Sequence, residues 1–120
     1  MVRQPHFRVE LLRILTILSD SENQDRTWGT SVPTGNGNFV VSMHFLLDDT
    51  ALADEPAEEI GDILNSHEEA QAIKRVTDSI LEVFDKIGNN LSAEKYFAHS
   101  DWAKVTALSQ EALKVFKKAE

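Results

Sequence analysis

The chain has 120 residues, of which 42% are hydrophobic and 27% are charged, and its formal net charge is −8. This length and balance suit one globular domain over residues 1–120 with a core of its own. Cysteine is absent, which excludes disulfides, thiolate nucleophiles and zinc-finger sites. No apolar run could span a membrane and the first residues lack a signal-peptide pattern, so we expect a cytoplasmic protein.

Residues 5–19 are predicted to form the first helix. Pro5 suits a first helical position, and the apolar residues after it recur every three or four positions. Three charged residues, Arg8, Glu10 and Arg13, fall off this apolar stripe, which makes the helix amphipathic. The following residues 29–38 contain three glycines, one proline and an Asn-Gly pair, a pattern that allows either a weak hairpin or an ordered loop.

Residues 39–47 are predicted to form a β-strand, because apolar side chains alternate along them. The predicted apolar face consists of Phe39, Val41, Met43, Phe45 and Leu47. The backbone of a single strand needs a hydrogen-bonding partner, either residues 27–32 or the same strand of a second copy. A homodimer through this strand is therefore one expected assembly.

The second half of the sequence is predicted to be helical. Pro56 opens a short acidic helix, and Ser66 with Glu69 forms a capping box in front of a long amphipathic helix that ends at Gly88. A further helix begins near Trp102 and runs towards the C-terminus. The predicted fold class is therefore mainly α with a minor β part: a small bundle of three principal helices, with one short strand or weak hairpin inserted after the first.

The negative charge is concentrated in one part of the sequence. Between Thr27 and Ile73 there are nine acidic residues and no lysine or arginine, so this window carries −9 and the remainder about +1. Nucleic-acid binding needs the opposite field and is not expected. A basic protein partner is the natural complement, while a solvated acidic face that maintains solubility is the simplest alternative.

The best enzyme hypothesis combines His44 with Asp48 and Asp49. In an extended strand His44 and Asp48 would share a face about 13 Å apart, too far to bind one metal ion without ligands from elsewhere. No catalytic triad, nucleophile elbow, phosphate loop or metal-ligand spacing occurs in the sequence. We therefore expect no catalytic residue, metal or cofactor, and a metal-dependent enzyme centred on His44 is kept as an alternative.

Several segments together resemble a family of small uncharacterised bacterial proteins. The shared features are the amphipathic first helix, RTWG, the segment HFLLDDTAL, the acidic IGDIL and two closing helices. This resemblance covers most of the chain and implies no particular chemistry. In size, acidity and lack of cysteine the chain is also similar to immunity proteins of bacterial toxin systems, including contact-dependent growth inhibition, which neutralise basic toxin domains such as nucleases.

The predicted function is non-enzymatic binding of a basic protein, most specifically neutralisation of a basic toxin domain by an acidic face. A housekeeping homodimer or adaptor is the second hypothesis. Acidic side chains and one aromatic anchor form the predicted contact set: Trp28, Asp48, Asp49, Asp54, Glu55, Glu58, Glu59 and Asp62.

Overall fold

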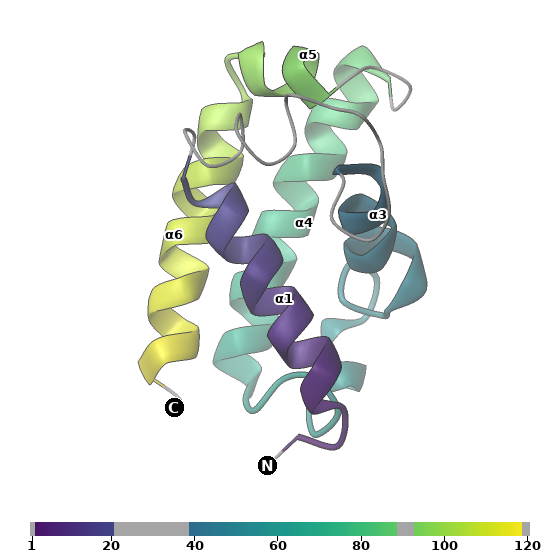
Figure 1. Ribbon diagram of the computed structural model, residues 1–120, viewed down its shortest axis with the longest axis vertical. Helices are drawn as coiled ribbons and strands as arrows, with labels where there is room; N and C mark the ends of the chain where they lie inside the picture. The colour runs from purple at the N-terminus through teal and green to yellow at the C-terminus, as the bar shows by residue number, and fades with distance from the viewer. Residues whose placement is uncertain (1, 21–38, 89–92, 119–120) are drawn as a thin grey trace.

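A computed structural model describes residues 2–20, 39–88 and 93–118, although the side chains of residues 39–41 and 93–94 lie outside the description. Three long helices form the framework: α1 (Pro5–Leu18), α4 (His67–Ile87) and α6 (Trp102–Lys118). α6 packs against both α4 and α1, so the three helices share one core (Figure 1). None of the described helices is long and apolar enough to cross a membrane.

The predicted helices of the framework are confirmed. Pro5 occupies the first turn of α1, and Gly88 ends α4 with a φ of +86°, a conformation that glycine adopts without strain. The buried positions of α4 recur every three or four residues, which explains why periodicity located this helix. The fully buried side chains include Leu11, Ile14, Leu15, Leu18, Ile73, Val76, Ile80, Val83, Val105, Ala112 and Phe116.

The predicted strand over residues 39–47 is wrong, because these residues are helical. α3 (Phe39–His44) continues directly into a π-helix, Phe45–Asp49, and this helical segment lies beside α4 (Figure 1). Met43 and Leu46, three residues apart, are both buried, whereas strand alternation would have placed them on opposite faces. A short apolar run does not distinguish strand from helix by itself, and packing against the helical core decides between them.

The correction removes the ground for pairing two copies through a strand edge. No residue in the described part of the chain belongs to a β-strand; a single isolated bridge joins Ile60 and Leu64. The Asn36-Gly37 pair and the rest of the hairpin prediction lie outside the described residues.

Residues 50–66 form a compact turn whose apolar side chains enter the core. Leu52, Ile63 and Leu64 are almost completely buried, although little regular structure surrounds them. The short helix expected after Pro56 is limited to one 3-10 turn, Pro56–Glu59. Gly61 then adopts a φ of +95° and donates its backbone N–H to the carbonyl of Leu64 at 2.7 Å. This turn ends the 3-10 helix and leads the chain to the start of α4.

Candidate functional site

The predicted contact residues that the structure describes lie on and just after the 39–49 helical segment. Asp48 and Asp49 occupy its last turn, and Asp54, Glu55 and Glu58 follow in the next turns; all five side chains are exposed. The backbone folds back between them, because Glu55 donates its N–H to the carbonyl of Ala51. We call these five residues the acidic surface. Trp28, the predicted aromatic anchor, lies outside the described residues.

The structure separates the predicted carboxylates into those with internal contacts and those without. Glu59 is half-buried and accepts the backbone N–H of Ala51 at 2.8 Å, which holds the turn closed. Asp62 forms an ion pair with Arg3 at 3.0 Å, beside the backbone bonds that join the N-terminus to residues 61 and 62. Both carboxylates thus have partners within the described fold, and the proposal below rests on the other five.

The remaining acidic side chains have few contacts with other described residues. Asp48 pairs with His44, but about two thirds of its side chain stays exposed. The carboxylates of Asp49, Asp54, Glu55 and Glu58 form no ion pair or hydrogen bond within the described residues. Among the described residues, no lysine or arginine side chain therefore pairs with the carboxylates of the acidic surface.

Asp48 and Asp49 occupy an electrostatically unfavourable position. They lie at the C-terminal end of an 11-residue helical segment, where unpaired carbonyls carry partial negative charge. Thr50 Oγ1 satisfies one of these carbonyls by donating to Phe45 O at 2.9 Å. Two acids at a helix C-terminus reduce stability, in contrast to Glu68 and Glu69 in the first turn of α4, where acids are favourable. Local conflict of this kind is typical of positions kept for function.

The His44–Asp48 pair differs from the geometry expected for a strand. The helical turn brings His44 Nδ1 to 2.7 Å from Asp48 Oδ2 instead of about 13 Å away. Both side chains are more than half exposed. No group of three or more metal-ligating side chains gathers around this pair or elsewhere among the described residues. The pair therefore has the geometry of a helix-surface contact, which an exposed His and Asp four residues apart form without a substrate.

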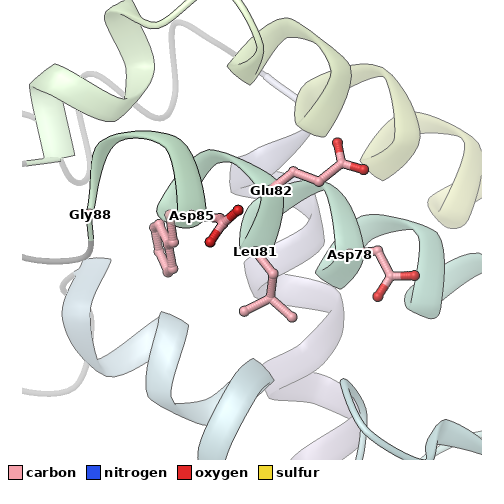
Figure 2. Close-up of a pocket in the computed structure, with 6 residues that line it drawn as sticks. Asp78, Leu81, Glu82, Asp85 and Gly88 are labelled. Atoms are coloured by element: carbon pink, nitrogen blue, oxygen red, sulfur yellow. The ribbon is translucent and has the colours of Figure 1, made fainter.

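A second acidic feature lies on the outer side of α4. Asp78, Leu81, Glu82, Phe84, Asp85 and Gly88 line an open cavity of about 770 Å³, and Leu81 points from α4 towards the neighbouring 39–49 segment (Figure 2). Two of its three carboxylates are paired, Asp78 with Lys74 at 3.1 Å and Glu82 with Lys104 at 3.3 Å. Internal pairing makes this cavity less available to a charged partner than the acidic surface.

The sequence pattern did not predict the buried ion pair between Arg8 and Glu69. Arg8, which the helical pattern places off the apolar stripe, is buried and donates two hydrogen bonds to Glu69 at 2.8 and 2.9 Å. Arg8 also donates to the carbonyl of Ile63 and lies over the ring of Phe116, 5.1 Å from its centroid. One guanidinium thus joins α1, α4, α6 and the 50–66 turn.

The predicted capping box is confirmed in one half only. Ser66 Oγ accepts the backbone N–H of Glu69 at 3.3 Å, as the motif requires. The Glu69 carboxylate does not return to Ser66 but accepts the N–H of Asn65 at 2.7 Å. The same carboxylate accepts the two hydrogen bonds from Arg8, and Glu69 is completely buried. The capping-box motif drew attention to Glu69 in the sequence, but it did not indicate that Arg8 would be the buried partner of its carboxylate.

A family model matches the chain over residues 2–120, nearly its whole length, and its description is DUF7945, a domain of unknown function. The chain belongs to this family. The expected membership of an uncharacterised family is confirmed to that extent, and nothing links the family to immunity proteins. No curated protein and no solved structure matches the chain significantly.

Proposed function

We propose that this DUF7945 protein binds a basic protein partner through the acidic surface. The observation that carries the proposal is the set of exposed carboxylates of Asp49, Asp54, Glu55 and Glu58 around one closed turn, which have no partner among the described residues. No lysine or arginine lies between residues 27 and 73. Cations from outside this window that reach it in the described structure, such as Arg3 and Lys74, contact Asp62 and the carbonyl of Ala53 and not these four carboxylates. A negatively charged surface raises the association rate with a positively charged protein, and salt reduces this effect because it screens the attraction.

The turn that carries the carboxylates is anchored on both sides. Leu46 and Leu52 fix it in the core, Glu59 closes it, and Lys74 Nζ donates to the carbonyl of Ala53 at 2.7 Å. A backbone held in this way loses little conformational freedom on binding, which favours recognition by position and not only by net charge. This rigidity supports a binding role over that of a surface kept only for solubility.

Toxin neutralisation is the most specific form of the proposal. Carboxylates can occupy the positions of substrate phosphates in the cleft of a basic nuclease, and the small acidic domain suits such an inhibitor. The support for this form is the profile of the chain alone: small, acidic and without cysteine. A toxin gene beside the gene for this protein, and protection of cells by co-expression, are the observations that test it.

Charge reversal at matched positions tests the binding proposal. The first variant carries Asp49→Lys and Glu58→Lys, and the control carries Asp85→Lys and Glu111→Lys, two exposed acids outside the acidic surface that form no ion pair among the described residues. Both double variants change the net charge by the same amount. A partner is captured on the wild-type protein at low salt and purified, and its association rate is measured by stopped-flow fluorescence.

We expect the first variant to associate about tenfold or more slowly, and the control to stay within about threefold of the wild type. Raised salt should slow the wild type and have less effect on the first variant, because screening acts on the same attraction. Equal rates for the two variants would show that only net charge matters and would refute the proposal.

A further inference from the structure

An open pocket with walls of opposite charge borders the acidic surface. It has a volume of about 650 Å³ and lies between residues 54–57 and the first turns of α4. Asp54 and Glu55 belong to the first wall, while His67 and Arg75 belong to the second. Pro56, Ala57 and Ala70 add apolar surface between the charges. The pocket thus offers both carboxylates and a guanidinium to one ligand.

The two walls are held in place relative to one another. Lys74 of α4 donates from Nζ to the carbonyl of Ala53 at 2.7 Å and also pairs with Asp78 at 3.1 Å. Its own charge is therefore engaged, and its side chain joins the turn to the helix. His67 and Arg75 both line the pocket from α4, and they lie about 12 Å apart along the helix because their positions differ by eight. These contacts join the two walls of the pocket within the described residues.

The opposite charges do not neutralise one another. Neither Asp54 nor Glu55 is within 4.0 Å of a cationic group of the described residues, and Arg75 forms no ion pair there either. A guanidinium and two carboxylates that line one pocket without meeting can each be paired by a ligand that carries both signs. A purely cationic ligand would satisfy the carboxylates but would be repelled by Arg75.

We propose that the pocket binds a mixed-charge segment of the partner protein, in which a lysine or arginine meets Asp54 and Glu55 while a nearby acidic residue meets Arg75. The aliphatic part of the basic side chain packs on Pro56 and Ala70. This inference rests on the proposed function and sharpens it: the acidic surface attracts basic proteins in general, and Arg75 selects those with an acid close to the base. The pocket would then act as the specific anchor within a broader electrostatic contact.

Short synthetic peptides test this selectivity directly. Three peptides of equal length are compared: one with arginine and glutamate separated by one glycine, a second with that glutamate replaced by glutamine, and a third with the arginine replaced by glutamine. Binding is followed by changes in the two-dimensional amide NMR spectrum of the ¹⁵N-labelled protein. Arg75→Gln is the test variant, and Lys114→Gln, an exposed cation on α6, is the matched control.

We expect the mixed-charge peptide to shift amides of residues 54–57 and 67–75 and to bind about two- to fivefold more tightly than either single-charge peptide. Arg75→Gln should abolish its advantage over the arginine-only peptide, whereas Lys114→Gln should preserve it. The inference is overturned if no peptide shifts these amides, if the glutamate adds no affinity, or if Arg75→Gln leaves the preference unchanged. These outcomes are independent of the charge-reversal experiment, which can still support a general acidic surface when the pocket shows no selectivity.

Discussion

The framework helix α4 and the segment from Phe39 to Glu59 differ in how well their sequence signals agree with the structure they form. In α4 the cap, the acidic first turn, the apolar face and the terminal glycine all favour the same structure. In the 39–59 segment a β-like pattern folds as helix, acids occupy a helix C-terminus, and the chain continues through turns with little regular structure. The sequence signals agree with one another in α4, which helps to specify the fold. They conflict in residues 39–59, which carry the candidate site.

The two regions nevertheless depend on one another through buried contacts. Leu46 and Leu52 enter the same core as the α4 side chains, and Lys74 of α4 holds the turn at Ala53. α4 therefore serves as the rigid base on which the acidic surface is mounted. If α4 supports the fold and residues 39–59 carry the site, substitutions in the framework should have the largest effect on stability.

The largest expected effect is on the buried ion pair of the framework. Glu69→Gln removes the carboxylate that pairs with the buried Arg8 guanidinium, which should lower the free energy of unfolding by about 3–5 kcal/mol. Glu68→Gln, at the exposed neighbouring position, should lower it by no more than about 1 kcal/mol. Urea denaturation followed by circular dichroism measures both. Similar losses for the two variants would show that Arg8 finds water or another partner when Glu69 is neutral.

An intermediate effect distinguishes helix from strand in the 39–49 segment. Leu46 is completely buried and Leu47 only partly, whereas the alternating pattern had placed Leu47 on the apolar face. Leu46→Ala should therefore cost about 2–5 kcal/mol, and Leu47→Ala about 1 kcal/mol because it leaves a smaller cavity. The same denaturation experiment gives both values. The reverse order would support the strand and contradict the helical packing described here.

The framework was predictable because its signals are local. Pro5, Ser66 and Gly88 act on the backbone at their own positions, and the 3–4 spacing of α4 is visible within a single element. The mainly helical fold class followed from these elements. The burial of Arg8 was not predictable, because it depends on Glu69, 61 positions away, and on a carbonyl of the 50–66 turn.

The 39–49 segment could not be assigned because its residue types and its environment disagree. Valine and phenylalanine favour strands, and the alternation of apolar residues matches a strand. In the described part of the chain no neighbouring strand pairs with this segment, so its backbone bonds are satisfied within a helix instead. The concentration of acids was visible in sequence, but the division between structural carboxylates such as Glu59 and unpaired ones such as Asp49 required the fold.

The smallest expected effect on stability carries the sharpest information about the site. Asp49→Asn removes a negative charge from a helix C-terminus without changing the shape of the side chain, so it should raise the free energy of unfolding by about 0.3–1 kcal/mol. Glu111→Gln, an exposed acid within α6, should change it by less than about 0.5 kcal/mol in either direction.

The central claim is that the exposed carboxylates of the acidic surface serve binding at the expense of stability. The most direct measurement compares unfolding free energy and association rate with the purified partner for Asp49→Asn and Glu111→Gln. We predict that Asp49→Asn is more stable than the wild type yet associates about two- to fivefold more slowly, while Glu111→Gln is unchanged in both respects. An Asp49→Asn protein that binds as fast as the wild type, or that loses stability, would contradict the claim.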